Sequence, residues 1–213
     1  MTTVIIEFSC AALCIFLMLA FKSGNRGLWL LAVAFLLSLI GDVFMGSRST
    51  GTNYFYGILF YFIAHICFSL YALGAISKGR LSWPLLAAVT IPYLVFYFAF
   101  LLQSPQLKGN SVLAAAVFFY LLVSCFSLTV SVDFGGGLSV SWIFTAGILC
   151  LLLSDTIIAL GDFMRYRRLS FMVMPLFHTS HILIVLSVTL KVLFQVKHCG
   201  KGKHNCIMAI WRQ

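Results

Sequence analysis

The stretch LLSLIGDVFMG (residues 36–46) closes a long apolar segment and yet carries a carboxylate, Asp42. A later stretch, CLLLSDTIIALGD (residues 150–162), repeats the arrangement with Asp155. A charged side chain near the centre of a membrane-spanning helix costs about 2.5 kcal/mol or more, so such residues face a protein interior or a wet cavity. These two carboxylates therefore indicate both the class of fold and the region where its function is expected.

The composition is that of a polytopic membrane protein. Of the 213 residues, 62% are hydrophobic and 9% are charged, whereas a soluble domain carries about 25% charged residues. So few charges cannot cover a water-facing surface. The apolar segments also lack the alternating polar positions of a transmembrane β-barrel. We therefore expect an all-α bundle of transmembrane helices.

Seven apolar segments reach the length of about 17–25 residues that a spanning helix needs. The gaps between them are short and contain Gly, Ser, Asn and Pro, which indicates loops. We predict one transmembrane helical domain over residues 1–196, with seven spanning helices, or eight if one long segment breaks, and a basic tail over residues 197–213. The seven segments are residues 4–21, 28–46, 54–77, 82–102, 111–130, 139–161 and 172–195.

The net charge of +9 indicates lipid headgroups, not nucleic acid, as the acidic partner. Lys and Arg lie in the short gaps and in the tail, which is their usual placement beside membrane helices. When the tail is counted, the basic residues favour an external N-terminus and a cytoplasmic C-terminus. We expect an integral, multi-pass protein, in the inner (cytoplasmic) membrane if the source is bacterial.

Counting along the segments places several polar residues at one depth. The second and sixth segments run in the same direction, and Asp42 and Asp155 each lie in the last third of their segment. The seventh segment starts on the side where those two end, so His178 and His181 share that depth. His65 lies about 11 residues into the third segment, roughly 16 Å at 1.5 Å per residue. These groups are therefore predicted to converge in one half of the membrane.

Spacing within the segments agrees with this prediction. Ser38 and Asp42 are four residues apart and share one helix face, as do Tyr61 and His65. A structural hydrogen-bond network between helices is the alternative role for such groups. For Asp42 and Asp155 together we favour a functional site, because ionisable residues inside a membrane usually mark one.

Three pieces around these residues resemble the YhhN family of lysoplasmalogenase-like membrane proteins: SLIGDVFM (38–45), GILFYFIAHICFSLY (57–71) and AGILCLLLSDTIIAL (146–160). The family pattern has a Gly-Asp near the end of its second helix, an Ala-His on its third and a Ser-Asp on a late helix. Their order and spacing fit over nearly the whole chain. The chain departs from the pattern at His181, where the family usually has Gln, and in its seven segments, where eight helices are often drawn.

The resemblance implies hydrolysis of the vinyl ether bond of lysoplasmalogens, which releases a fatty aldehyde and glycerophosphoethanolamine or glycerophosphocholine. It carries catalytic roles onto Asp42, His65 and Asp155, with Ser38 and Ser154 beside them as expected substrate-binding residues. Protonation of the alkenyl carbon gives an oxocarbenium ion that water attacks. Two carboxyl groups can supply the acid, the base and the nearby negative charge, as in glycoside hydrolysis. Which of the two aspartates is the acid stays open, and His65 is expected to orient one of them or the water.

Four further residues are expected to bind the substrate. Tyr61 and His181 lie at the depth of the two acids. Arg48 and Arg165 lie on the membrane side nearest those acids and could hold the phosphate headgroup, although ordinary interfacial flanking explains them equally well. Asp162 suits an interfacial salt bridge with the neighbouring arginines. We expect no metal or other cofactor. The expected partners are a lysophospholipid and the bilayer, while the oligomeric state is left open.

Other function classes remain as alternatives. A metal-dependent lipid hydrolase, resembling the alkaline ceramidase and adiponectin-receptor superfamily, could use His65, His178, His181 and an Asp, since zinc sites take three protein ligands plus water. A transporter or channel could use the two aspartates as a proton or cation relay, and inverted repeats or broken helix pairs would support it. Bound metal and sensitivity to a chelator would favour the first of these alternatives.

Overall fold

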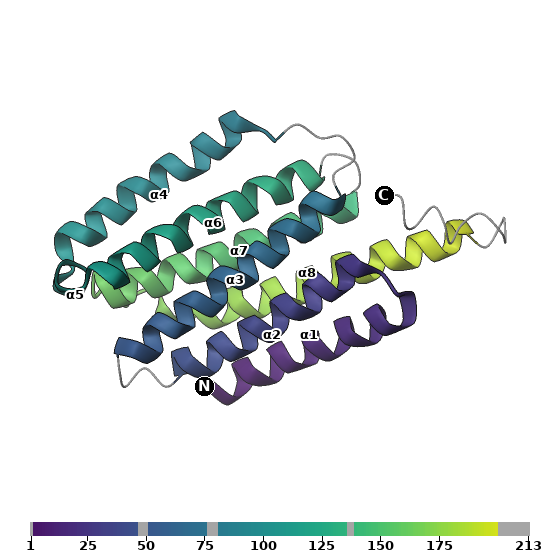
Figure 1. The fold of residues 1–213 in the computed structure, drawn as a ribbon, viewed down its shortest axis with the longest axis horizontal. Helices are drawn as coiled ribbons and strands as arrows, with labels where there is room; N and C mark the ends of the chain where they lie inside the picture. The colour runs from purple at the N-terminus through teal and green to yellow at the C-terminus, as the bar shows by residue number, and fades with distance from the viewer. Residues whose placement is uncertain (1, 47–50, 76–80, 136–138, 200–213) are drawn as a thin grey trace.

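The computed structural model describes residues 2–46, 51–75, 81–135 and 139–199. In these ranges the chain forms eight α-helices and one short 3-10 helix (Figure 1), which confirms the prediction of an all-α helical bundle. The elements are α1 (Thr2–Ser23), α2 (Arg26–Gly46), α3 (Gly51–Ala75), α4 (Trp83–Gln103), α5 (Pro105–Gly109), α6 (Ser111–Gly135), α7 (Ser139–Phe163), η1 (Ser170–Met172) and α8 (Val173–Cys199).

Six of the helices, namely α2, α3, α4, α6, α7 and α8, are long and apolar enough to cross a membrane. Each corresponds to one of the predicted segments. In α1 the apolar stretch Ser9–Lys22 is shorter than the other six. The chain is therefore built as a multi-pass membrane protein, with α1 as an additional apolar helix.

Gly24 and Asn25 form the turn that ends α1 and starts α2. Gly24 follows α1 with a φ of 65°, which glycine adopts without strain, and its N–H donates to the Ala20 carbonyl at 2.8 Å. Asn25 then accepts a hydrogen bond from the Gly27 N–H at 2.8 Å through its side chain. These tight turns make α1 and α2 antiparallel neighbours.

The helix α5 corrects one detail of the prediction. The stretch between the fourth and fifth predicted segments was expected to be a loop, but it contains a short α-helix of 5 residues, Pro105–Gly109. Proline suits the first turn of a helix because the N–H it lacks has no partner there anyway. Leu107 anchors the turn, with 1% of its surface exposed. The eighth α-helix thus comes from a gap, and the long segments remain unbroken.

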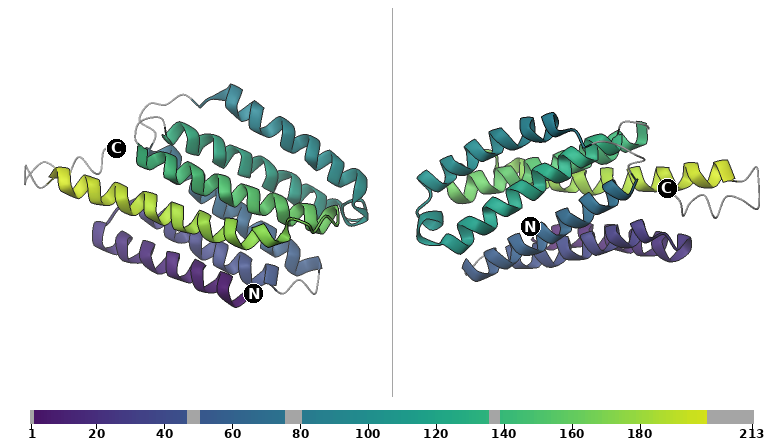
Figure 2. Two further views of the ribbon diagram at one scale, coloured as in Figure 1. Left: turned by 180° about the vertical axis from the view of Figure 1, so that it is seen from behind. Right: turned by 45° about the horizontal axis from the view of Figure 1, so that its top comes forward.

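Six helices close into a ring in the order α1, α2, α3, α6, α7, α8, each packing on the next and α8 packing back on α1. The helix α4 lies outside this ring, against α6 and α5. Figure 1 and Figure 2 show α4 along one edge of the molecule, far from α1. Only 11% of the apolar stretch of α4 is buried, compared with 33–50% for the other five spanning helices. The ring therefore has an interior shared by six helices, and α4 flanks it.

Small and aromatic residues fill that interior. The rings of Phe16 and Phe35 stack with centroids 5.0 Å apart, and Phe35 meets Phe68 edge to face. A Cβ at Gly147 would lie 3.1 Å from the Ser180 carbonyl oxygen, so glycine here lets α7 and α8 approach closely. Close contact of this kind holds helices together in lipid, where the hydrophobic effect does not drive their association.

Candidate functional site

Asp42 on α2 is 4% exposed and is held by hydroxyl groups from two neighbouring helices. The Tyr61 hydroxyl on α3 donates to Asp42 Oδ1. The Ser9 hydroxyl on α1 lies 2.7 Å from Asp42 Oδ2, within hydrogen-bond distance. Gly41 makes this arrangement fit, because a Cβ there would lie 3.2 Å from the Tyr61 ring. The Gly-Asp pair of the sequence therefore seats a tyrosine against the carboxyl group.

His181 on α8 extends this network. Its Nε2 lies 3.4 Å from the Ser9 hydroxyl, and its Nδ1 lies 2.9 Å from the Phe177 carbonyl oxygen. A carbonyl oxygen can only accept, so we assign the ring hydrogen to Nδ1, and Nε2 is left as an acceptor. Ser9 and His181 are both buried. A chain of polar groups thus runs from Asp42 through Ser9 to His181, across α2, α1 and α8.

Asp155 on α7 has a second, similar set of partners. The Tyr120 hydroxyl on α6 donates to Asp155 Oδ2 at 2.5 Å. His65 Nε2 on α3 lies 3.6 Å from the same oxygen, and its ring meets Tyr120 edge to face at 5.5 Å. The Asp155 side chain is 16% exposed, whereas His65 is 1% exposed. Asp155 is therefore the more accessible of the two acids.

His65 has unused hydrogen-bonding capacity. Within the described ranges, neither of its ring nitrogens has a hydrogen-bond partner, although both are buried. Buried polar atoms of native proteins are nearly always paired, so an exception calls for a role or a bound molecule. His65 is thus able to hold a water or a substrate atom beside Asp155.

The two carboxyl groups share one interior. The helix α3 links them, because it carries both Tyr61, which donates to Asp42, and His65, which lies beside Asp155, one helical turn apart. Each acid has one tyrosine donor, and the donors come from adjacent helices of the ring. Asp42, His65 and Asp155 thus lie on three helices of the ring, α2, α3 and α7, with His65 beside Asp155 and Asp42 held from the same helix α3 by Tyr61.

Two of the predicted serines lie nearby but serve differently. Ser38 is buried one turn before Asp42 on α2. The Ser154 hydroxyl donates to the Val173 carbonyl at 3.2 Å and so joins α7 to α8. Tyr61 and His181, expected to bind substrate, contact Asp42 and Ser9 respectively. Arg48 lies outside the described residues.

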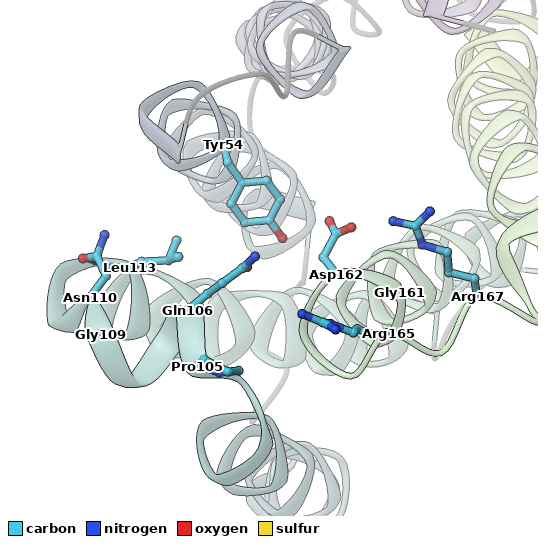
Figure 3. Close-up of a pocket in the computed structure, with 10 residues that line it drawn as sticks. All are labelled: Tyr54, Pro105, Gln106, Gly109, Asn110, Leu113, Gly161, Asp162, Arg165 and Arg167. Carbon is cyan, nitrogen blue, oxygen red and sulfur yellow. Dashed lines mark hydrogen bonds between the residues drawn. The ribbon is translucent and has the colours of Figure 1, made fainter.

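Arg165 lines an open cleft of about 720 Å³ at the end of α7. Figure 3 shows Tyr54, Gln106 and Asp162 turned toward this cleft, with Arg165 and Arg167 beside Asp162. Asp162 lies seven residues after Asp155 on the same helix, which is about 10 Å at 1.5 Å per residue. The cleft therefore opens about two helical turns from Asp155. Its lining residues are Tyr54, Pro105, Gln106, Gly109, Asn110, Leu113, Gly161, Asp162, Arg165 and Arg167.

Two members of the site, Ser9 and Tyr120, were not predicted from the sequence. The helices α1 and α6 begin on the membrane side where α2, the helix of Asp42, ends. Ser9 and Tyr120 each lie within about nine residues of the start of their helix, and so in the same half of the membrane as Asp42. The depth count that grouped Asp42 and Asp155 could therefore have found them. It passed over them because serine and tyrosine are common in membrane helices and carry no charge.

In the ranges that the structure describes, no three His, Cys, Asp or Glu side chains lie close enough together to hold a metal ion. His65 lies beside Asp155, whereas His181 contacts Ser9, which lies beside Asp42. The three-ligand group that the metal-dependent alternative needs is thus not assembled in this part of the chain.

Comparison with known proteins agrees with the motifs. No curated protein and no solved structure matches the chain. The sequence profile of the YhhN family matches residues 3–188, which run from the second residue of α1 to Val188 in α8. That match covers well over half of the chain and includes both acids and their tyrosine partners. The chain therefore belongs to the YhhN family.

Proposed function

We propose that this protein hydrolyses the vinyl ether bond of lysoplasmalogens, with Asp42 and Asp155 as its acid–base pair. The observation that supports this most is that two carboxyl groups of the helix ring, on α2 and α7, each accept a hydrogen bond from a tyrosine of the adjacent helix. General acid and general base catalysis needs two titratable groups in different environments. The two acids differ in exposure and in partners, as such a division of roles requires.

The reaction adds water across an alkenyl ether. A carboxylic acid gives its proton to the outer alkenyl carbon, and the carbon bonded to oxygen becomes an oxocarbenium ion. A water then attacks that carbon and loses a proton to a carboxylate. His65 can orient this water, because its nitrogens are unpaired and its Nε2 lies 3.6 Å from Asp155. The hemiacetal collapses to a fatty aldehyde and the glycerol hydroxyl.

The cleft at the end of α7 suits the headgroup. The phosphate would bind Arg165 and Arg167, because arginine presents several N–H donors to phosphate oxygens. Six bonds separate the phosphorus from the reacting carbon, and an extended chain covers about 1.2 Å per bond, or roughly 7 Å. An arginine contact adds about 3 Å. The sum, about 10 Å from the reacting carbon to a guanidinium group, is comparable to the rise of about 10 Å from Asp155 to Asp162. Arg165 and Arg167 lie beside Asp162 in the cleft.

The alkenyl chain requires an apolar path, and one lies between α4 and α6. An apolar groove of about 500 Å³ follows these two helices. Two residues after Ile91 of this groove, the Tyr93 hydroxyl lies 2.9 Å from the hydroxyl of Thr156, the residue that follows Asp155 on α7. A lipid could thus place its head in the cleft, its vinyl ether at Asp155 and its chain along α4. The groove is lined by Trp83, Leu86, Ala87, Thr90, Ile91, Leu122, Val123 and Phe126.

The test is release of aldehyde by the purified protein from lysoplasmalogen, with the saturated ether analogue as substrate control. We expect cleavage of the vinyl ether only, unaffected by chelator. Asp42→Asn and Asp155→Asn should each lower turnover by about 100-fold or more, the usual contribution of a positioned acid or base. Asp133→Asn is the matched control, because Asp133 accepts from the Ser82 N–H outside the site. Wild-type turnover in both variants, with intact folds, would refute the proposed pair.

A further inference from the structure

Ser9 has one hydroxyl hydrogen but lies between two groups that can accept it. On one side is Asp42 Oδ2 at 2.7 Å, and on the other is His181 Nε2 at 3.4 Å. The ring hydrogen of His181 is placed on Nδ1, because the Phe177 carbonyl can only accept and the Ser180 hydroxyl, 3.2 Å from the same nitrogen, donates its own hydrogen to that carbonyl. Nε2 therefore presents a lone pair. If Asp42 were ionised beside a neutral His181, the Ser9 hydrogen would serve Asp42 alone. Nε2 would then face an oxygen lone pair in a buried site.

Two arrangements of hydrogens satisfy every contact in the hydrogen-bond chain Asp42–Ser9–His181. In the first, Asp42 is a carboxylic acid that donates to Ser9, and Ser9 donates to His181 Nε2. In the second, Asp42 is ionised, His181 is an imidazolium that donates to Ser9, and Ser9 donates to Asp42. Both contain one proton more than an ionised Asp42 beside a neutral His181. With the ring hydrogen on Nδ1, these contacts favour an additional proton on the Asp42–Ser9–His181 chain.

The surroundings decide between these two arrangements. Ser9, Asp42 and His181 are each at most 4% exposed, and the His181 ring is enclosed by the rings of Phe35 and Phe177. Separating a positive and a negative charge in such an interior costs far more than hydrogen-bonding neutral groups there. The uncharged arrangement is the one that these contacts favour.

We propose that Asp42 is the general acid, and that Ser9 and His181 are positioning residues that keep its carboxyl group protonated. This inference rests on the proposed function and adds a role for each carboxyl group. Asp155 is then the base. It has the greater exposure, and His65, which can hold the attacking water, lies beside it.

The hydrogen-bond chain Asp42–Ser9–His181 can also assist the proton transfer from Asp42 to the alkenyl carbon. The Asp42 O–H bond breaks as its proton forms a bond to the alkenyl carbon, using the π electrons of the double bond. The Ser9 hydroxyl then turns its hydrogen from His181 to the new Asp42 carboxylate. That carboxylate thereby accepts from both Ser9 and Tyr61. Donors placed in advance around a developing charge are the kind of stabilisation that accelerates reactions most.

The proton balance closes over one turnover. Water loses a proton to Asp155 as its oxygen bonds to the oxocarbenium carbon. When the hemiacetal collapses, its hydroxyl proton goes to Asp42 and the Asp155 proton goes to the departing glycerol oxygen. Asp42 is again an acid and Asp155 again a carboxylate. No oxidant, reductant or further reactant is required.

The proton assignment can be measured without substrate. Infrared spectra of the purified full chain, with and without ¹³C-labelled aspartate, separate the C=O band of an aspartic acid from the bands of a carboxylate. We expect one isotope-sensitive acid band that disappears in Asp42→Asn and persists in Asp155→Asn. An acid band that disappears only in Asp155→Asn, or a wild-type protein with every aspartate ionised, would overturn the assignment.

Substitutions of Ser9 and His181 test whether these two residues position the Asp42 proton. Ser9→Ala removes the acceptor of the Asp42 proton, so the acid band should move to higher frequency, and turnover should fall roughly 10-fold as expected for one lost hydrogen bond. His181→Gln keeps an acceptor for Ser9 and should retain most of the band position, whereas His181→Leu should not. Ser187→Ala is the control, since Ser187 is a buried serine of α8 that donates to the Val140 carbonyl away from the chain. A band that is unmoved in both Ser9→Ala and His181→Leu would contradict the positioning role.

The two proposals fail in different measurements. If the acid band behaves as expected but no aldehyde is released from lysoplasmalogen, the substrate is wrong and the proton assignment stands. If aldehyde is released but Asp42 is ionised in the infrared spectra, the hydrolase proposal stands and the roles of the two carboxyl groups must be exchanged.

Discussion

Arg165 occupies an unusual backbone position for a long side chain. It has a φ of 56°, and it is the only residue other than glycine with a positive φ in the described parts of the chain. The position lies two residues after Phe163, the end of α7, where helices commonly end in a left-handed residue that is usually glycine. An L-residue pays about 1–2 kcal/mol for this conformation. Backbone strain of this kind tends to persist at functional sites, and here it puts a guanidinium group at the rim of the cleft.

Arg165→Gly should therefore change stability and substrate affinity in opposite directions. We expect a higher unfolding temperature, because relief of the strain is worth about 1 kcal/mol. We also expect a KM for lysoplasmalogen about 10-fold higher, because a hydrogen bond from a charged group is lost. Thermal unfolding and aldehyde release in the same detergent measure both quantities. Arg168→Ala, which removes an exposed arginine three residues later, should change neither, and an unchanged KM in Arg165→Gly would exclude the cleft as the headgroup site.

At the level of single residues, the charged members of the candidate site could be predicted from the sequence, whereas its neutral members could not. Asp42 and Asp155 stood out because a carboxylate is costly in a membrane, and their depths predicted that they would meet. Ser9 and Tyr120 carry no such cost, so nothing in the sequence set them apart from other serines and tyrosines. Ser154 illustrates the reverse case, since it follows the family pattern but bonds to a backbone carbonyl of the next helix.

At the level of helices, the contact between α2 and α3 controls how Asp42 is held. Gly41 faces the ring of Tyr61, and a Cβ there would lie 3.2 Å from two of the ring carbons. The Tyr61 hydroxyl reaches Asp42 across this close approach. The glycine therefore matters through the distance between two helices and not through backbone freedom.

Gly41→Ala should push the Tyr61 ring away and weaken its hydrogen bond to Asp42. We expect turnover to fall about 10-fold, the equivalent of one hydrogen bond to a buried acid. In a Tyr61→Phe background the same substitution should cost little more, because the bond is already absent, and a double-mutant cycle on aldehyde release measures this coupling. Gly74→Ala is the control, since a Cβ at Gly74 meets nothing within 4 Å. Additive effects of Gly41→Ala and Tyr61→Phe would contradict the explanation.

The extent of each long helix could be predicted because membrane thickness fixes the length of an apolar run. The predicted segment at residues 28–46 corresponds to α2, Arg26–Gly46, and the segment at 139–161 to α7, Ser139–Phe163. The short α5 could not be predicted in this way. Its single buried residue, Leu107, gives no periodic pattern, and Pro105 and Gly109 read as loop residues.

At the level of the whole molecule, the order of the helices around the ring was not predictable. The spanning helices are apolar on every side, since lipid and protein interior favour the same residues, so the sequence does not show which face meets which neighbour. Depth could be counted along each helix, but the neighbours of α3 could not. The packing of α3 against α6 brings Tyr120 to His65 and Asp155. It also leaves α4 outside, against the apolar groove.

The position of α4 leads to a prediction about substrate chain length. Ala87 is exposed and lines the groove between α4 and α6, so Ala87→Trp should fill part of the path proposed for the alkenyl chain. We expect the KM for a long-chain lysoplasmalogen to rise severalfold, and that for a short-chain analogue to stay unchanged, because each buried CH₂ contributes about 0.8 kcal/mol. Ala115→Trp places the same side chain on an exposed position of α6 outside the groove lining and should leave both values unchanged. Equal KM values for the two chain lengths in Ala87→Trp would show that the chain takes another route to Asp155.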